Sequence, residues 1–255
     1  MDDKAEELRR YEEVARQALE SARPVVPDEL GASAVAPELR TPYIHYEQRI
    51  HELVSPAHRV LELGAGSGLH TAVLVRTGAR VTASDLSPSA LELLQRRLAP
   101  LAPERLITRV ADMEALPFVS GSFDVVACAG SLSYGEPYLV DAEVRRVLRD
   151  GGTFVCVDSL NHNPVYRLNR WLHYTRGKRT RSTLMRMPNA RRIEAIGQHF
   201  KSVEVRYFGA LTWTMPLLRR VLGGNGASRI SDAVDELMNV KRSAFKFVLV
   251  AQGRR

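Results

Sequence analysis

The sequence has few cysteines: Cys128 and Cys156 are the only two among 255 residues. A scaffold stapled by several disulfides is therefore excluded, and both cysteines lie in apolar runs typical of strands, so we expect buried, reduced thiols. The chain also lacks any stretch of roughly 20 uninterrupted apolar residues, the length that a membrane-spanning helix needs. Its first twenty residues are charged throughout, without the apolar core of a signal peptide. We expect a cytoplasmic protein with no membrane span.

Acidic residues are outnumbered, since 36 Lys and Arg face 29 Asp and Glu and give a formal net charge of +7. Such a charge suits nucleic acid, an anionic membrane surface or an acidic small substrate. The hydrophobic share of 45% and the charged share of 25% are ordinary for a soluble globular protein. The length allows one sizeable domain with an insertion, or two small domains.

From residue 59 onward, apolar runs alternate with helical patterns. Strands are expected at 59–64, 80–85, 105–112, 123–130, 153–159, 201–209 and 243–253. Runs rich in Val, Leu and Ile without strict alternation are typical of strands that helices cover on both faces. Repeated strand–helix units predict an α/β fold with a parallel, doubly wound sheet. The last run alternates better, which predicts an antiparallel edge strand.

The segment before the first strand has a different pattern. Helical spacing of apolar residues over 1–20, several prolines, and a second helix over 43–54 predict an N-terminal helical lid or cap over residues 1–57. We expect this lid to cover a ligand through Tyr43, His45 and Tyr46. The rest of the chain, 58–255, is expected to form the main domain. Insertions are expected at about 159–187 on the substrate side and at about 210–240.

Three glycines, Gly64, Gly66 and Gly68, stand at alternate positions directly after the first apolar run. Glycine permits tight turns and close approach of a ligand to the main chain, and the first strand–helix turn of a parallel sheet is an expected ligand site. A triphosphate-binding loop would continue with Gly-Lys-Ser/Thr, but Leu69 and His70 follow Gly68, which excludes it. A dinucleotide fingerprint would need Gly or Ala where Leu69 stands, which weakens the nicotinamide and flavin alternatives and leaves them open.

Four motifs occur in order over about residues 59–158: "VLELGAGSG", "ASDLSPSALELL", "VADMEALPFVSGSFDVVACAGSLSY" and "EVRRVLRDGGTFVCVD". Together they resemble the class I S-adenosylmethionine-dependent methyltransferases. The resemblance implies S-adenosylmethionine as cofactor. It also implies a Rossmann-like, doubly wound, seven-stranded and mostly parallel sheet with an antiparallel last strand. Glu62, two residues before the first glycine, would act indirectly, through the loop or a water molecule.

The resemblance also assigns residues at strand ends to parts of the cofactor. The glycine loop would pass under the methionine moiety, and Asp85 would accept both ribose hydroxyls. Leu86 and Met113 would flank the adenine, and Asp112 would accept from its amino group. The alternative for Asp85 is a turn or cap residue. For Met113 it is an ordinary core residue, and for Asp112 a solvated acid in a loop. The implied cofactor-binding residues are Glu62, Gly64, Ala65, Gly66, Gly68, Asp85, Leu86, Asp112, Met113, Ala129 and Ser131.

Methyl transfer requires the nucleophile to be held in line with the methyl group, and a hydroxyl acceptor also requires a base, whereas an amine does not. Ala129 to Ser131, beyond the fourth strand, would line the transfer position. Our candidate for the base is His162, in a polar loop after the fifth strand; the alternative is an ordinary surface histidine. No metal is expected in the site. Candidate substrate-binding residues are Tyr134, Tyr166, Arg170 and His173.

A basic segment with no acidic residue extends from Arg167 to Arg192. It is either a solvated face or a clamp for a phosphate- or carboxylate-bearing acceptor. Basic residues among aromatics also suit RNA, but no separate RNA-binding module is present and the Asn/Asp-Pro-Pro-Tyr/Phe signature of amino-methylating enzymes is missing. We expect a methyltransferase acting on a hydroxyl of a small molecule, a sugar or secondary metabolite, with no stable nucleic-acid partner. An RNA methyltransferase and a non-catalytic cofactor-binding module are the alternatives.

Overall fold

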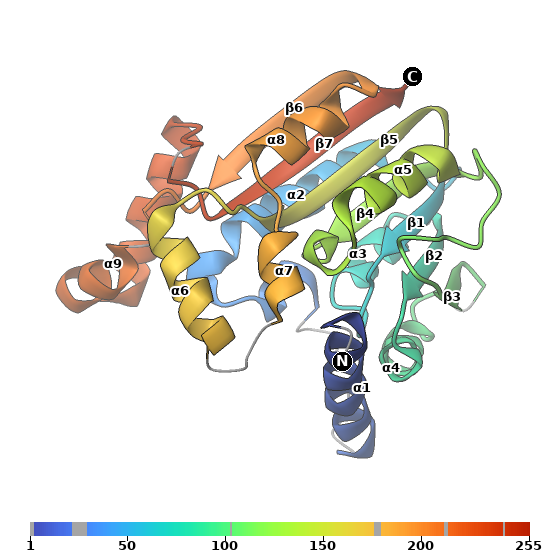
Figure 1. Ribbon diagram of the computed structural model, residues 1–255, viewed down its shortest axis with the longest axis horizontal. Coiled ribbons are helices and arrows are strands. Elements are labelled where there is room, and N and C mark those ends of the chain that lie inside the picture. The colour runs from blue at the N-terminus through green and yellow to red at the C-terminus, as the bar shows by residue number, and fades with distance from the viewer. Residues whose placement is uncertain (1–2, 22–29, 103, 176–179, 212–213, 242) are drawn as a thin grey trace.

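The computed structural model describes residues 3–21, 30–102, 104–175, 180–211, 214–241 and 243–255. Seven strands in this part of the chain form one sheet, with helices on both of its faces (Figure 1). The strands are β1 (Arg59–Leu63), β2 (Arg80–Asp85), β3 (Leu106–Val110), β4 (Phe123–Ala129), β5 (Leu148–Ser159), β6 (Phe200–Phe208) and β7 (Lys246–Arg254). The α-helices are α1 (Asp3–Glu20), α2 (Thr41–Leu53), α3 (Thr71–Arg76), α4 (Pro88–Leu98), α5 (Pro137–Val147), α6 (Pro164–Thr175), α7 (Arg181–Met185), α8 (Ala190–Gly197) and α9 (Met215–Leu237). The short 3₁₀ helices are η2 (Gly31–Ala34), η3 (Pro37–Leu39) and η4 (Leu132–Tyr134).

The strand order is β3-β2-β1-β4-β5-β7-β6, and β7 alone runs opposite to the other six. This confirms the prediction of a doubly wound, mostly parallel sheet with an antiparallel last strand. The order reverses between β1 and β4, because the chain leaves β3 at one edge and re-enters the sheet beside β1. In sheets of this type, ligands bind beyond the carboxyl ends of the strands at the reversal.

The position of β7 differs from the predicted edge. It lies inside the sheet, antiparallel to both β5 and β6, so the edges are β3 and β6. The first six residues of β7 are all buried, whereas four successive residues of β6 are exposed. The apolar sequence Phe247 to Ala251 suits a strand covered on both faces. The apparent alternation was therefore a poor guide to its place in the sheet.

Alternate residues of the central strands enter two cores. In β4, Val126 and Cys128 face the core that α5 and α8 cover, while Val125 and Ala127 face the core that α2 and α3 cover. Cys128 and Cys156 are both buried and free, as predicted. Because both faces of the sheet are closely packed, the sheet is rigid and fixes the positions of the loops at its edge.

Helix ends follow the signals in the sequence. The Ser87 hydroxyl accepts from the backbone N–H of Ala90 at 3.0 Å, and Pro88 takes the first position of α4, as the Ser-Pro pair predicts. Asn189 caps α8 in the same way. Helix α5 ends at Val147, and β5 begins at the next residue, Leu148.

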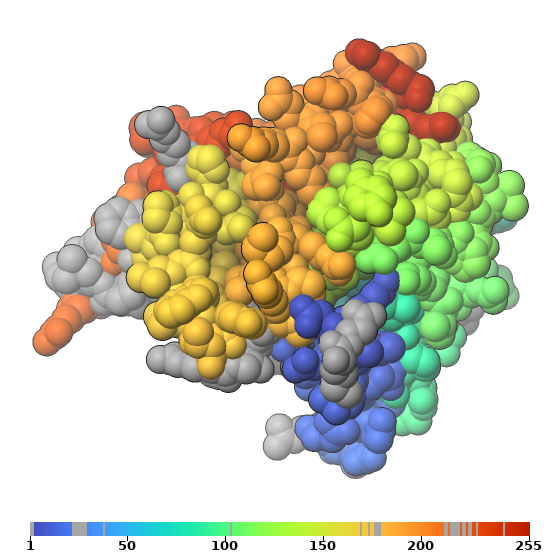
Figure 2. Space-filling model, viewed as in Figure 1, coloured from blue at the N-terminus to red at the C-terminus, as the bar shows by residue number. Residues whose placement is uncertain are grey.

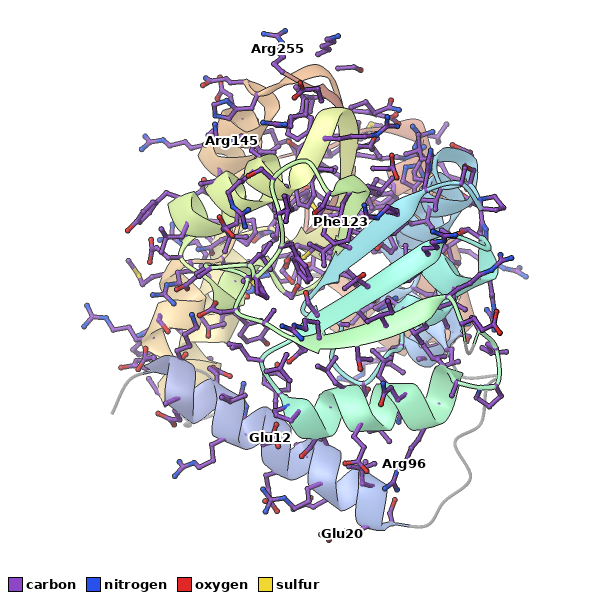
Figure 3. All side chains as sticks on the ribbon, turned by 90° about the vertical axis from the view of Figure 1, so that its right-hand side faces the viewer. Glu12, Glu20, Arg96, Phe123, Arg145 and Arg255 are labelled. Carbon is purple, nitrogen blue, oxygen red and sulfur yellow. The ribbon has the colours of Figure 1, made fainter. Side chains whose placement is uncertain are left out.

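The first helix lies on the surface and packs against α4 and α7 (Figures 1 and 2). Seen from the side, α1 runs along α4, with Glu12 near the start of α4 (Figure 3). The predicted insertions contain α6 and α7 in one case and α9 in the other. Within the described residues, no helix combines the length and apolarity that crossing a membrane requires.

Candidate active site

A cavity of about 460 Å³ opens at the carboxyl ends of β1, β2 and β4, where the strand order reverses. This volume lies in the range usual for small-molecule sites. Gly64, Asp85 and Ala129 contribute to it from the ends of these strands. The opposite wall comes from α1, through residues such as Leu8 and Tyr11, and from α7. Segments far apart in the sequence therefore enclose one space.

The three loop glycines all have positive φ angles of 52–84° but face different surroundings. A Cβ on Gly64 would meet the Ser131 side chain at 2.4 Å, and a Cβ on Gly68 would meet Leu94 at 2.7 Å. These two glycines let the loop pack against β4 and α4. A Cβ on Gly66 would meet nothing within 4 Å, and Gly66 lines the cavity. Gly66 is thus where a ligand can come closest to the main chain.

Asp85, at the end of β2, joins the glycine loop to the start of α4. One carboxylate oxygen accepts from Gly66 N–H at 2.8 Å, and the other accepts from Ser87 N–H at 2.9 Å. Burial raises the pKa of Asp85, and these N–H donors counteract that rise. A carboxylate held in this way still has free lone pairs for ligand hydroxyls.

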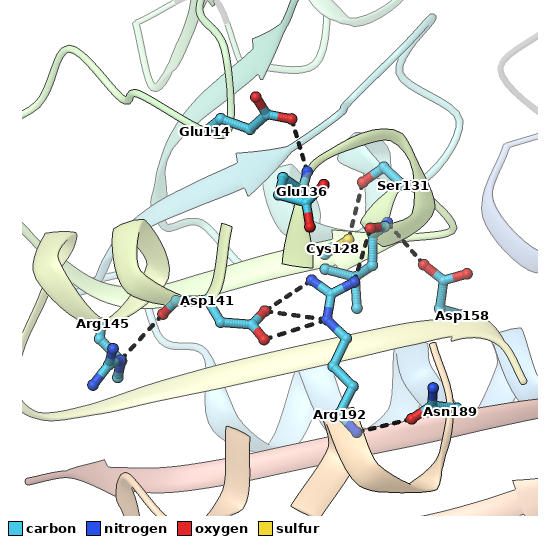
Figure 4. Close-up of polar contacts among 10 residues, drawn as sticks. Glu114, Cys128, Ser131, Glu136, Asp141, Arg145, Asp158, Asn189 and Arg192 are labelled. Atoms are coloured by element: carbon cyan, nitrogen blue, oxygen red, sulfur yellow. Dashed lines mark hydrogen bonds and ion pairs between the residues drawn. The ribbon is translucent and has the colours of Figure 1, made fainter. Parts of the chain in front are cut away.

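Beneath the cavity, polar contacts hold the loop after β4 (Figure 4). The Ser131 hydroxyl donates to the Leu63 carbonyl at 2.7 Å, and Leu132 N–H donates to Asp158 at 2.9 Å. The buried Arg192 donates to the Leu132 carbonyl at 3.0 Å and forms an ion pair with Asp141 at 2.8 Å. These contacts hold the backbone at 129–132 firmly in place.

Glu62 is wholly buried below the glycine loop and outside the cavity lining. Its carboxyl accepts from the Thr71 hydroxyl at 2.5 Å and so connects β1 to the first turn of α3. Burial raises the pKa of Glu62 to about 7, and the nearby Asp85 adds to the rise.

The first helix is fastened to the main domain at both sides of the cavity. Near its start, Lys4 pairs with Asp112 at 2.5 Å and with Glu114 at 2.9 Å. The hydroxyls of Tyr11 and Tyr134 are hydrogen-bonded, and their rings meet edge to face.

A second set of contacts joins α1 to α7. The Glu7 carboxylate accepts from Thr180 N–H at 3.2 Å and from the Thr180 and Thr183 hydroxyls at 3.0 and 3.1 Å. Asp3 accepts from Ser182 N–H at 2.8 Å. Both carboxylates lie at the start of α7, where unpaired backbone N–H groups favour negative charge. The two helices thus form one joined wall.

A histidine that the sequence analysis left unassigned, His70, lines the cavity. Its ring stacks on Tyr43 with centroids 4.8 Å apart, and its Nδ1 is buried with no hydrogen bond to any described residue. Burial, with Lys246 nearby, lowers the pKa of His70 to about 4. The imidazole is therefore neutral at pH 7. Tyr43 and Lys246 are 27 and 176 residues away in sequence, so no local pattern revealed this setting.

The structure brings part of the predicted site together. The predicted residues that line the cavity are Gly64, Ala65, Gly66, Asp85, Leu86, Met113, Ala129, Ser131 and Tyr134. Gly68 and Glu62 support the loop from outside the lining, and Asp112 is held by Lys4.

The predicted substrate side is more scattered. His162 is exposed and is not among the described residues that line the cavity. Tyr166 and Arg170 are buried beside Phe245, and Arg170 donates to the Leu160 carbonyl, so both support α6. The side chain of His173 lies outside the described residues.

The three lid residues predicted to cover the ligand do not line the cavity. Tyr46 is fully buried in the core, His45 packs on Phe208, and neither they nor Tyr43 line the cavity. The N-terminal wall comes instead from α1, through Leu8, Tyr11 and neighbouring residues. An N-terminal lid over the ligand was predicted, but not that residues 1–20 would contribute to the cavity wall in place of Tyr43, His45 and Tyr46.

Comparisons with known proteins agree with this geometry. A family model described as a methyltransferase domain matches residues 61–156. The demethylmenaquinone methyltransferase of Clavibacter sepedonicus is 41% identical over 111 residues, which are 43% of this chain and 44% of that protein. An uncharacterized protein of Mycobacterium tuberculosis is 40% identical over 107 residues, 42% of this chain and 38% of that protein. The chain thus spans less than half the length of these curated relatives.

Among solved structures, the geranyl diphosphate C-methyltransferase from Streptomyces coelicolor A3(2), in complex with geranyl diphosphate and S-adenosyl-L-homocysteine, is similar with a TM-score of 0.59. The two chains are 17% identical, and the match covers 85% of this chain and 80% of that one. At this identity, the likeness shows the fold. Fold and glycine loop together define a Rossmann-like methyltransferase domain. Residues 61–156 thus match a methyltransferase domain, and the fold is the one seen in solved S-adenosylmethionine-dependent methyltransferases, as the motifs predicted.

Proposed function

We propose that this chain transfers a methyl group from S-adenosylmethionine to a small-molecule acceptor, with a hydroxyl of a sugar or secondary metabolite as the preferred group. The observation that carries the proposal is the open space beside Gly66, in the same cavity as Asp85 and a neutral histidine. The bound cofactor would supply an electrophilic methyl group on a sulfonium. The residues of the chain would hold both reactants and take up the proton.

The cofactor side of the cavity suits a nucleoside bearing a charged chain. Gly64, Ala65 and Gly66 offer main chain for the methionine moiety, and Asp85 offers lone pairs for the ribose diol. Leu86 and Met113 offer apolar surface for the adenine. Asp112, which Lys4 now holds, is proposed to meet the adenine amino group.

The acceptor side would lie near Ala129 and Ser131. Arg186 also lines the cavity, while pairing with Glu136 at 3.1 Å, and suits an acceptor that bears a phosphate or carboxylate. RNA has less support, because Arg170 and Arg192 of the basic segment are buried in structural contacts.

We propose His70 as the proton acceptor for a hydroxyl. Asp85 and Glu7, the carboxylates in the lining, already accept several hydrogen bonds. His70 also lines the cavity, and because its Nδ1 is buried, Nε2 is the nitrogen proposed to take the proton. A hydroxyl proton becomes strongly acidic as its oxygen bonds to the methyl carbon, so a weakly basic imidazole suffices.

The cofactor proposal is tested by calorimetry. Asp85→Ala should weaken S-adenosylhomocysteine binding at least tenfold, because the ribose hydroxyls lose their acceptor. NAD should bind more weakly than S-adenosylhomocysteine to the unaltered protein. Unchanged affinity in Asp85→Ala, or tighter binding of NAD, would remove the basis of the proposal. Cofactor binding without transfer to any acceptor pool would favour the non-catalytic module.

The base is tested with matched variants. His70→Asn should lower kcat about 100-fold with a hydroxyl acceptor, while S-adenosylhomocysteine affinity changes less than threefold. His162→Asn should keep its activity, and the opposite result would favour the base predicted from sequence. Because the pKa of His70 is about 4, kcat of the unaltered enzyme should be flat between pH 6 and 8 and fall only as pH falls toward 4. If both variants keep full kcat, neither histidine is the base.

A further inference from the structure

Helix α6 turns apolar side chains toward solvent. Val165, Leu168, Trp171 and Leu172 are 49%, 59%, 54% and 37% exposed. At about 100° per residue, the four fall within an arc of about 120° on one side of the helix. A solvent-facing side of a helix is ordinarily polar, and a contiguous apolar stripe marks a site of interaction.

The opposite side of α6 fixes the helix in this orientation. Tyr166 and Arg170, which face the interior, are only 7% and 6% exposed. Arg170 donates to the Leu160 carbonyl at 3.0 Å and lies 5.5 Å from the centre of the Phe245 ring. Rotation of α6 to bury the stripe would break these contacts. The apolar arc is therefore a stable part of the surface.

Positive charge accompanies the stripe. Arg167 on α6, together with Arg181 and Arg191 nearby in the chain, is exposed. The sequence from 161 to 192 contains nine Arg and Lys and no acidic residue, and of these nine Arg170 and Arg192 are buried. Apolar and tryptophan side chains on one face with arginines beside them are typical of helices that lie in the interface of an anionic membrane.

We propose that the exposed apolar face of α6, together with the exposed Arg167 on α6 and Arg181 at the start of the adjacent α7, docks on an anionic membrane surface. The occupant is lipid rather than a second copy of the chain for reasons of area and charge. A 12-residue helix is about 18 Å long and offers roughly 200 Å² on one face, whereas a stable interface needs about 800 Å² per partner. A second copy would also bring a like charge, because the chain carries +7.

The proposed surface adjoins the cavity. Helix α6 packs against α7, which contributes Ser182 and Thr183 to the lining, and Arg186 directly after α7 also lines the cavity. On the visible face of the molecule, α6 (yellow) lies beside α7 (orange), with α1 (blue) next to it (Figure 2). Docking through α6 would bring the cavity near the lipid headgroups. The inference depends on the exposed side chains of α6 and the neighbouring α7, and stands whether or not the proposed reaction is correct.

The test is co-sedimentation of the full chain with vesicles at 0.15 M salt. The protein should bind vesicles of phosphatidylcholine with about 30% phosphatidylglycerol at least tenfold more tightly than vesicles of phosphatidylcholine alone. The double variant Leu168→Ala with Trp171→Ala should bind the anionic vesicles at least tenfold more weakly. Arg167→Gln with Arg181→Gln should remove most of the preference for anionic lipid.

A matched control removes two exposed apolar side chains elsewhere. Ile107→Ala with Val119→Ala changes residues that are 63% and 79% exposed and lie outside α6. This variant should bind anionic vesicles like the unaltered chain. Trp171→Phe, which keeps an apolar ring, should retain most of the affinity, and circular dichroism confirms the fold of each variant.

Several results would overturn the proposal. The protein could fail to bind anionic vesicles, or could bind both kinds of vesicle equally. The α6 variant and the control could also lose the same amount of vesicle affinity. Dimers in sedimentation velocity that the α6 variant abolishes would identify a second copy as the occupant instead.

Discussion

Gly66 and Gly68 have the same left-handed backbone, yet a side chain at each would meet different neighbours. At Gly66 an added Cβ would point into open space, and at Gly68 it would press on Leu94 of α4. Gly66 thus leaves room for a ligand, whereas Gly68 allows the loop to pack on α4. The sequence shows the spacing of these glycines but not which of them faces the cavity.

This difference predicts opposite effects of two alanine substitutions. Gly68→Ala should lower the free energy of unfolding by about 2 kcal/mol or more, from backbone strain and overpacking. Gly66→Ala should cost only about 1 kcal/mol of strain but weaken S-adenosylhomocysteine binding at least tenfold, because the methyl occupies ligand space. Urea unfolding and calorimetry measure the two effects. Normal binding by a folded Gly66→Ala protein would show that no ligand reaches this part of the main chain.

Glu62 predicts a dependence of stability on pH. Its pKa is about 7 in the folded chain and 4.5 in the unfolded chain, so the folded state prefers the protonated carboxyl. The resulting stability is fully present below pH 4.5 and is lost as pH rises through 7. Glu62→Gln should therefore match the unaltered protein at pH 4.5 and be more stable at pH 8.5, by at most about 3 kcal/mol. Urea unfolding at both pH values tests this, and an equal effect at both would show that Glu62 does not titrate in this way.

At the scale of elements, α1 is held by side-chain contacts rather than by the sheet. It is joined to α7 through Glu7 and Asp3, to the loop after β3 through Lys4, and to the start of α4 through Glu12. Its apolar residues face the cavity instead of a closed core. Such an element can detach while the rest of the molecule stays folded.

Glu7→Ala should therefore loosen α1 without unfolding the protein. The substitution leaves Thr180 and Thr183 without their acceptor, and S-adenosylhomocysteine should bind about tenfold more weakly while the urea midpoint hardly moves. Glu13→Ala is the matched control, because Glu13 is exposed on α1 and its carboxylate accepts a hydrogen bond from Gln17 of the same helix. Equal affinity in the two variants would exclude the joined wall as a source of binding energy.

The positions of strands and helices could be predicted from local sequence patterns, but the contacts between distant segments could not. The Ser87 cap and the buried β4 residues are set by neighbours in sequence, so the prediction was good there. The interior place of β7 depends on pairing with β6, and the neutral state of His70 depends on Tyr43 and Lys246. Those partners are distant in sequence, and a single chain gives no sign of which segments will meet.

At the scale of the whole molecule, stability is uneven. The central strands are buried on both faces, whereas α1 and α6 expose much of their surface. Local opening should therefore concentrate in the helices around the cavity, away from the sheet. The site combines a rigid floor with a wall that can open.

Native-state hydrogen exchange should show this division. Backbone amides of β1, β4 and β5 should exchange slowest, and those of α1 much faster, because few buried contacts protect α1. Adding S-adenosylhomocysteine should slow exchange in α1 at least tenfold and leave the core strands nearly unchanged, since the ligand would fill the cavity that α1 covers. If α1 exchanged no faster in the free protein than when bound, it would not be a movable wall.

The place of β7 has a consequence for the newly made chain. Synthesis proceeds from the N-terminus, so β5 and β6 leave the ribosome before the strand that joins them. During that interval each presents an unpaired edge, the feature through which nascent chains adhere to one another. Production of this protein should therefore depend on chaperones at that stage, and on translation through residue 254 without a long pause.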